Sequence, residues 1–356
     1  MSKPAGAAVT AAREALDFDL GAVDAWLKSA CPEIAGTPEV EPLLGGASNL
    51  TCRLRYPEHD LVLRRPPPGR KARSAHDMGR EFNIQKALRP FYPHVPEMIA
   101  LCTDPAVIGC DFYLMRRLDG IVLRRHTPAG KLPDPGTAGA LCTAMIDRLA
   151  ALHRVDWRAA GLETFGRGEG YIARQIAGWR ERYARARTWN VPSFTAVGAW
   201  LEANRPEEVM TCVIHNDFRL DNLLLDRRQP ATIIAVLDWE MATLGDPLMD
   251  LGAALAYWVE AGDDLVMRAV RRQPSHLPGM MRRDEIVQEY GRRMGIGTDL
   301  WPFYEVYGLF RLAAIAQQIY QRYHLGQTHN PAFKHFWLIV NYLHHRCRRI
   351  IRHSGF

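Results

Sequence analysis

Short apolar runs, separated by polar and glycine-rich stretches, dominate residues 39–118 and predict β-strands. A helix is expected between the third and fourth runs, because Met78 to Arg89 carries a partial apolar stripe at helical spacing. An amphipathic helix over 19–30 precedes them. The order of strands and helix predicts a compact first lobe. The strand-like runs are EVEPLLGG (39–46), NLTCRLRY (49–56), DLVLRRP (60–66), EMIALCT (97–103) and DFYLMRRL (111–118).

Helical periodicity takes over from Leu141 onward, where apolar residues recur on one face. Further helices are expected over 171–186 and 301–323. Two short strand-like runs interrupt this pattern, and both end in acidic residues. The sequence therefore predicts an N-terminal extension with a helix over 1–38, a first lobe over 39–118 and a mainly helical second lobe over 119–356.

Composition narrows the class of protein and its location. The 356 residues are 47% hydrophobic, enough to bury a large core. The seven cysteines are scattered with no CxxC pair, which argues against a zinc site or a disulfide framework and is typical of a reducing cytosol. No secretory leader is recognisable and no run approaches the ~20 apolar residues of a membrane helix. We therefore expect a cytoplasmic protein without a membrane partner.

The net charge of +6 admits anionic partners such as nucleotides or coenzyme A esters, although a basic surface alone also explains it. The basic tail RCRRIIRH belongs to no recognised nucleic-acid-binding motif, so a solvated helix face is the better interpretation and no nucleic-acid partner is expected. The composition says nothing of the oligomeric state.

The acidic segments carry the candidate chemistry. In VIHNDFRLDNLLLD (213–226), Asp217 and Asn222 have the spacing of an H-x-D-x-x-x-x-N catalytic loop, and the next apolar run, IIAVLDWE, contains Asp238. Phosphoryl transfer needs a base for the acceptor hydroxyl, hard oxygen ligands for magnesium and cations around the phosphates. The segment contains residues for each of these tasks, whereas ordinary turn residues would match this spacing only by chance.

HNDFRLDNLLLD followed by AVLDWEMATLGDPLMDLG resembles the aminoglycoside phosphotransferase family, which includes choline kinase-like enzymes. The stretch LFRLAAIAQQIYQRYHLGQ is similar to the branch in which a kinase-like domain is fused to acyl-CoA dehydrogenases. The likeness runs from about Val40 to Gln327. It implies an α+β, bilobal protein-kinase-like fold, with a five-stranded antiparallel sheet in the N-lobe and a mainly helical C-lobe.

The resemblance implies roles for the matching residues and the cofactors ATP and Mg²⁺. Asp217 would orient and deprotonate the acceptor hydroxyl, and Asn222 and Asp238 would bind magnesium. Glu240, in DWE, is a candidate for a supporting or metal-adjacent carboxylate.

Three further residues of the C-lobe match the family pattern. Arg219 is a candidate for contacting the γ-phosphate, although an ion pair with Asp221 or Asp226 explains it equally well. His215 is expected to shape the catalytic loop rather than to transfer protons. Asp250 is expected to support the loop from beneath.

The first lobe would bind the nucleotide. Gly45 and Gly46 would let the backbone approach the phosphates, and Ser48 would offer them a hydroxyl. Adenine would lie near Met115, with backbone groups around Arg116 to Leu118 reading its edge. Gly-Gly between strands is by itself a weak signal, since it commonly marks only a turn.

One position departs from the best-known kinase-like pattern. The strand that normally ends in a phosphate-contacting lysine offers Arg64 instead, with Glu81 in place as its partner acid. Arginine keeps the charge, but its planar fork is not equivalent to an ammonium group. The likeness to a branch that uses arginine here favours an active variant.

Two functions follow from these residues. The first is an ATP-dependent kinase that phosphorylates a hydroxyl of a small molecule, and the resemblance implies a hydroxylated acyl or acyl-CoA compound. Aminoglycosides are polycations, so this basic chain is not expected to accept them. The alternative is a non-catalytic nucleotide- or ligand-binding pseudokinase. A protein kinase is disfavoured, because no A-P-E segment follows Asp238.

Overall fold

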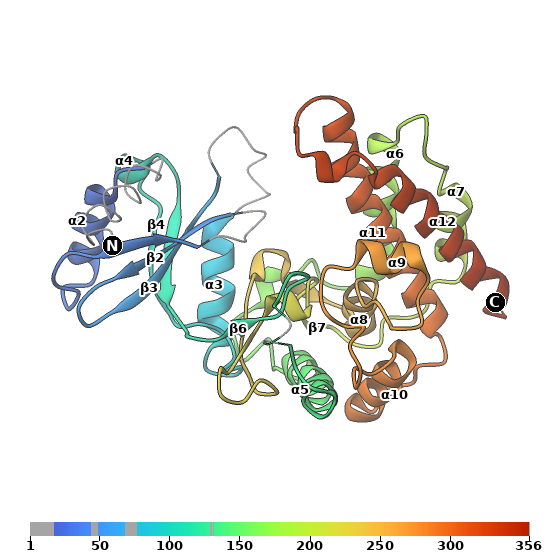
Figure 1. The fold of residues 1–356 in the computed structure, drawn as a ribbon, viewed down its shortest axis with the longest axis horizontal. Helices are drawn as coiled ribbons and strands as arrows, with labels where there is room; N and C mark the ends of the chain where they lie inside the picture. Colours follow the sequence, from blue (N-terminus) through green and yellow to red (C-terminus); the bar gives the residue numbers. More distant parts are fainter. Residues whose placement is uncertain (1–17, 44–48, 68–76, 129, 131, 356) are drawn as a thin grey trace. The chain divides into compact units, whose positions relative to one another are not determined.

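The computed structural model describes residues 18–355, apart from 44–48, 68–76, 129 and 131. The chain forms two compact units (Figure 1). The first, which we call the sheet unit, extends to Asp119 and also contains Leu237–Glu240. The second, the helical unit, contains Gly120–Val236 and Met241–Phe356. Asp238 therefore belongs to the sheet unit, although the chain before Leu237 and after Glu240 belongs to the helical unit.

The sheet unit is built on a five-stranded antiparallel sheet with the order β1-β2-β3-β5-β4. This confirms the α+β fold with an antiparallel N-lobe sheet that the sequence predicted. Among the described residues of this unit three helices accompany the sheet, of which α4 was not predicted. The elements are α2 (Leu20–Ala30), β1 (Glu39–Pro42), β2 (Leu50–Arg55), β3 (Asp60–Arg65), α3 (Met78–Leu88), β4 (Met98–Cys102), α4 (Pro105–Ile108) and β5 (Phe112–Arg116).

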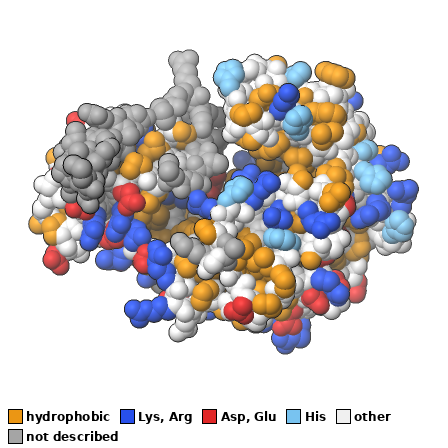
Figure 2. Space-filling view, viewed as in Figure 1, with side chains coloured by type: hydrophobic (Ala, Val, Ile, Leu, Met, Phe, Trp, Pro, Cys, Tyr) orange, Lys and Arg blue, Asp and Glu red, His pale blue; other side chains and the backbone are white. Residues whose placement is uncertain are grey.

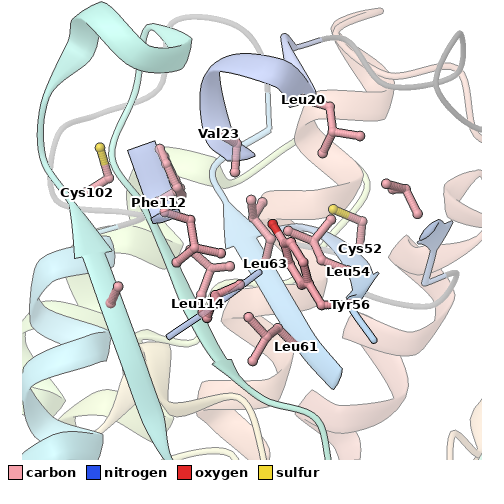
Figure 3. Close-up of a cluster of buried hydrophobic side chains, with 14 residues drawn as sticks. Leu20, Val23, Cys52, Leu54, Tyr56, Leu61, Leu63, Cys102, Phe112 and Leu114 are labelled. Atoms are coloured by element: carbon pink, nitrogen blue, oxygen red, sulfur yellow. The ribbon is translucent and has the colours of Figure 1, made fainter. Parts of the chain in front are cut away.

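Side chains of one strand alternate between the two faces of a sheet. Both faces of this sheet carry buried side chains. In β3, Leu61 and Leu63 face the larger core with α2, whereas Val62 packs in a smaller cluster with α3. Figure 3 shows the larger core, in which Leu20 and Val23 of α2 meet side chains of the central strands. Helices thus pack on the two faces of the sheet, while β3 also carries the charged residues Asp60, Arg64 and Arg65.

The helical unit contains short strands as well as helices. Its helices are α5 (Pro135–His153), α6 (Tyr171–Ala186), α7 (Thr195–Ala203), α8 (Pro247–Leu255), α9 (Leu265–Val270), α10 (Arg283–Met294), α11 (Trp301–His324) and α12 (Phe336–His353). Its strands are β6 (Ile121–Val122), β7 (Cys212–Ile214), β8 (Leu223–Leu225), β9 (Ile233–Val236) and β10 (Thr243–Gly245). In the described part of the chain there are also the 3-10 helices η2 (Glu163–Phe165), η3 (Leu220–Asn222), η4 (Trp239–Met241) and η5 (Pro331–Phe333).

Helix α11 is the centre of the helical unit and packs against α6, α8 and α12. Two glycines allow its closest approach: Gly308 of α11 faces Gly252 of α8, and a Cβ added at Gly308 would lie 2.1 Å from the Gly252 carbonyl oxygen. The strands pair as β6-β8-β9 and β7-β10. The loop after β7 contacts α8 through Asp250 and α11 through Arg311.

Basic side chains are dispersed over the face of the helical unit that Figure 2 draws. Figure 2 shows Lys and Arg side chains interspersed with hydrophobic and neutral ones on the visible face of the helical unit. Among the residues that the structure describes, no helix has both the length and the apolar character that crossing a bilayer requires.

Candidate functional site

The candidate catalytic loop lies in the helical unit, between β7 and β8, and Asp217 is held there by two neighbours. Asp217 Oδ2 accepts hydrogen bonds from Arg219 Nη2 at 2.9 Å and from Asn222 Nδ2 at 2.8 Å. Asn222 Nδ2 also donates to the Asp217 carbonyl oxygen at 2.8 Å. In the described residues no donor reaches Asp217 Oδ1, and the side chain is 19% exposed. The carboxylate is therefore anchored at one oxygen and open at the other.

Asp250 of α8 lies beneath this loop and is fully buried. Its Oδ2 accepts from the His215 backbone N–H at 2.8 Å and its Oδ1 from the Asn216 N–H at 2.7 Å. Burial alone would raise the pKa of Asp250, but hydrogen bonding and the nearby His153 and His215 lower it overall. The Asp250 carboxylate is thus kept charged and acts on the loop through its backbone.

Arg219 contacts two acids and one aromatic ring. Besides Asp217, its Nε lies 3.4 Å from Asp221 Oδ1, and its guanidinium lies 4.4 Å from the centre of the Tyr257 ring. Burial lowers the pKa of Arg219, but Asp217, Tyr257 and Asp221 raise it overall, so the group stays charged. Of the two ion pairs expected as alternatives, the structure shows the one with Asp221.

In the sheet unit, Arg64 lies between two acids. Arg64 Nη1 is 3.2 Å from Glu81 Oε1, and Arg64 Nη2 is 2.9 Å from Asp238 Oδ1. Burial alone lowers the pKa of Arg64, but Tyr113, Glu81 and Asp238 raise it overall. Burial raises the pKa of Glu81, and Arg64 opposes that effect. The structure thus brings together the three charged residues that the sequence assigned to nucleotide and metal.

Asp238 adopts a left-handed backbone conformation with φ 68°, which is uncommon for residues other than glycine. Asn216, with φ 64°, is the other such non-glycine residue in the described part of the chain. Such conformations concentrate at functional sites, where the surrounding structure maintains them. The Glu240 carboxylate accepts from Asn49 Nδ2 at 3.2 Å within the sheet unit, so it is hydrogen-bonded rather than free.

Of the other residues predicted to contact the nucleotide, Met115 and Arg116 lie in β5 and Leu118 follows it. Gly45, Gly46 and Ser48 lie outside the described residues. Met115 is 8% exposed and belongs to the core cluster of α3. The Arg116 N–H already donates to the Glu97 carbonyl oxygen at 2.8 Å, whereas Leu118 N has no hydrogen bond within the described residues. The role of these backbone groups in reading adenine stays a prediction.

Sequence reasoning placed Arg311 on a helix beside the expected substrate site and gave no role to Asn216 or Tyr171, and it predicted none of the contacts that join these three residues at the catalytic loop. Tyr171 OH donates to Asn216 Oδ1 at 3.2 Å, and Arg311 Nη2 donates to the Asn216 carbonyl oxygen at 2.9 Å. One signal was available: Arg311 interrupts the apolar run GLFRLAAIA. Within the described residues no group of three or more His, Cys, Asp or Glu side chains is arranged to hold a metal ion.

Comparison with known proteins decides the family. A profile of the family described as "Phosphotransferase enzyme family" matches residues 39–286. The chain belongs to this family. Its resemblance to aminoglycoside phosphotransferases and to kinase-like domains fused to acyl-CoA dehydrogenases is thereby confirmed.

Curated relatives of this phosphotransferase are longer proteins. Mouse acyl-CoA dehydrogenase family member 10 is 38% identical over 80% of the chain, which spans 26% of that protein. Human acyl-CoA dehydrogenase family member 11 is 34% identical over 87% of the chain, which spans 40% of that protein. The chain therefore corresponds to less than half of these relatives.

Solved structures agree with the family. A Ralstonia eutropha protein assigned to the aminoglycoside phosphotransferases is 30% identical, with a TM-score of 0.77 over 93% of this chain and 99% of that one. Choline kinase from Cryptosporidium parvum is 12% identical with a TM-score of 0.62, covering 94% of this chain and 96% of that one, and shows the shared fold. Family and fold together support a small-molecule phosphotransferase.

Proposed function

We propose that this chain transfers the γ-phosphoryl group of ATP to a hydroxyl of a small molecule. The observation that carries the proposal is the asymmetry of the Asp217 carboxylate: Oδ2 is anchored by Arg219 and Asn222, while Oδ1 has no donor in the described residues. A general base must be fixed in orientation and still have an acceptor atom free. Asp217 Oδ1 meets both conditions, so we assign it to the acceptor hydroxyl.

The chemistry follows from the charges around this atom. The hydroxyl oxygen attacks the γ-phosphorus, the bond to the β-γ bridging oxygen breaks, ADP leaves and the hydroxyl proton passes to Asp217 Oδ1. Arg219 has two tasks in this proposal, because its guanidinium holds Asp217 and its positive charge favours the anionic phosphoryl group. Arg64 is assigned to the nucleotide phosphates, which arginine grips through its planar fork.

Two oxygen atoms fit the requirements of magnesium, which prefers hard oxygen ligands. Both amide hydrogens of Asn222 are directed to Asp217, so Asn222 Oδ1 remains for a cation. Asp238 Oδ1 accepts from Arg64, and no described residue donates to Asp238 Oδ2. We propose Asn222 Oδ1 of the helical unit and Asp238 Oδ2 of the sheet unit each as a candidate ligand of magnesium, which when bound would neutralise charge on the phosphates. The proposed use of ATP is supported by the fold neighbour aminoglycoside phosphotransferase APH(4)-Ia, which was solved with AMP-PNP and hygromycin B.

For the acceptor we propose a hydroxylated acyl or acyl-CoA compound. The curated relatives carry the name acyl-CoA dehydrogenase, which supports acyl chemistry. A polycationic aminoglycoside is disfavoured, since Arg219 and Arg311 are both close to the catalytic loop. Cations that would attract an anionic group would repel an aminoglycoside.

The test is a screen of hydroxylated acids, their coenzyme A esters and aminoglycosides for acceptor-dependent ADP formation. We expect turnover with a hydroxyacyl compound, and a loss of about 10²–10⁴-fold in kcat for Asp217→Asn. The matched control is Asp226→Asn, because Asp226 is an acid of the same segment whose carboxylate caps a surface turn. Equal rates for wild type and Asp217→Asn would refute the role of the base.

A pseudokinase remains the second candidate, favoured by Arg64 standing where a lysine is usual and by its contact with Asp238. Nucleotide binding measured by calorimetry, combined with analysis of the products, separates the two functions. A pseudokinase binds ATP with the same affinity in wild type and Asp217→Asn and forms no ADP with any acceptor, whereas the kinase forms phosphorylated product that mass spectrometry detects.

A further inference from the structure

Asn216 has every polar group of its backbone and side chain engaged, and the partners come from four different segments. Its N–H donates to Asp250 of α8 at 2.7 Å, and its carbonyl oxygen accepts from Arg311 of α11 at 2.9 Å. Its side-chain Oδ1 accepts from Tyr171 of α6 at 3.2 Å, and Nδ2 donates to the Met241 carbonyl oxygen at 3.1 Å. Asn216 is therefore fixed from all sides.

The backbone of Asn216 explains why the residue is asparagine. At φ 64° the backbone of residues other than glycine, asparagine and aspartate is strained. Glycine would satisfy the backbone alone, but it has no amide to bridge Tyr171 and Met241. The structure thus uses a residue that tolerates the conformation and adds two hydrogen bonds.

These contacts bear directly on the proposed reaction. Asp217 follows Asn216 in the chain, and Met241 follows Asp238 by three residues. A rotation of the Asn216 peptide would turn the Asp217 carboxylate away from Arg219 and Asn222. Displacements of about 1 Å at a reacting group can lower a rate by about 10²-fold, so this peptide has to be held firmly.

We propose that Asn216 is a positioning residue, whose side-chain amide ties the catalytic loop to Tyr171 and Met241 and so holds Asp217 in its reactive orientation. The inference rests on the proposed phosphotransferase function. Tyr171 is the donor on one side: burial raises the pKa of Tyr171 well above its usual value, so its hydroxyl keeps its proton and donates. The Met241 carbonyl oxygen is the acceptor on the other side.

The decisive variant is Asn216→Gly, because glycine keeps the left-handed backbone and removes only the amide. We expect kcat of the folded protein to fall about 10–100-fold, while its ATP affinity stays within about threefold of wild type. The melting temperature should also fall, because Tyr171 OH and the Met241 carbonyl oxygen lose their partner. A purely structural asparagine would lower the melting temperature and leave kcat of the folded protein unchanged.

A double-mutant cycle tests the Tyr171 contact. Tyr171→Phe removes the hydroxyl that donates a hydrogen bond to Asn216 Oδ1. Its effect on kcat should not add to that of Asn216→Gly, because both substitutions remove the same hydrogen bond. The matched control is Tyr183→Phe on the same helix: Tyr183 OH donates to the Pro192 carbonyl oxygen at 2.7 Å, away from the loop. Tyr183→Phe should leave kcat at the wild-type value.

The outcomes separate the two proposals. A wild-type protein that transfers no phosphoryl group overturns the proposed function and the role of Asn216 with it. An active wild type together with a fully active Asn216→Gly protein overturns only the positioning role. Additive effects of Asn216→Gly and Tyr171→Phe would also overturn it, because the two side chains would then act independently.

Discussion

The guanidinium of Arg64 bridges the carboxylates of Glu81 and Asp238, at 3.2 Å and 2.9 Å. Glu81 comes from α3, and Asp238 belongs to the segment Leu237–Glu240 that joins the sheet unit from far along the chain. Because the Glu81 side chain is only 1% exposed, its interaction with Arg64 is little screened by water. Arg64 is therefore the counter-charge that stabilises the Glu81 and Asp238 carboxylates.

Replacing Arg64 should separate the effect of its charge from the effect of its shape. Arg64→Met leaves Glu81 buried without a counter-charge, so we expect a loss of about 3–5 kcal/mol in the free energy of unfolding. Arg64→Lys keeps the charge but loses the fork, and should retain most of that stability. Urea unfolding of both variants measures this difference, and equal destabilisation by Met and Lys would contradict it.

Glu81→Gln should weaken the use of ATP rather than abolish it. Without the second acid, Arg64 is drawn to Asp238 alone and is less available to phosphate. A hydrogen bond to a charged group contributes about 1.5–3 kcal/mol, so kcat/KM for ATP should fall about 10–100-fold. The control is Glu41→Gln, which removes an exposed partner of Arg53 and should change neither stability nor kcat/KM.

The ring of Tyr257 should matter for catalysis, while its hydroxyl should not. Arg219 lies over this ring, and a cation–π contact of this kind contributes about 0.5–2 kcal/mol. Tyr257→Phe keeps the ring and should have the kcat of wild type, whereas Tyr257→Leu should lower kcat by about 2–30-fold. Steady-state kinetics at saturating ATP decide the matter, and equal rates for Phe and Leu would rule out a role of the ring.

Asp246, the N-cap of α8, should give the stability a dependence on pH. Burial raises its pKa from 3.8 to about 6, although backbone N–H groups of Val209, Leu248 and Met249 oppose the shift. A raised carboxyl pKa means that the folded state binds a proton more readily than the unfolded state, so its contribution is complete below pH 3.8 and is lost as the pH rises through about 6.

Asp246→Asn removes this titration and keeps a capping oxygen. Relative to the Asn variant, the wild type should lose about 2.4 kcal/mol of unfolding free energy between pH 4 and pH 7. Denaturant unfolding at several pH values measures the difference. Parallel pH profiles of the two proteins would show that Asp246 does not titrate in this range.

The order and type of the main elements were predictable from the sequence, because they depend on local patterns. Tyr171–Ala186 and Trp301–His324 form helices as their apolar periodicity predicted, and the five strands of the sheet unit fall within the predicted runs. The helices α7 to α10 were missed. α8, for example, is buried along its whole length and so has no polar face to reveal a period.

The sequence by itself also determined the candidate catalytic residues, since the spacing from Asp217 to Asn222 and the following Asp238 are features of linear order. Only the tertiary structure decided which distant side chains hold the loop that carries Asp217. Asp250, Arg311 and Tyr171 converge on Asn216 from three helices that are distant in sequence. No periodicity reports such contacts, because a hydrogen bond depends on the positions of two atoms in space, and only the packing of α6, α8 and α11 sets them.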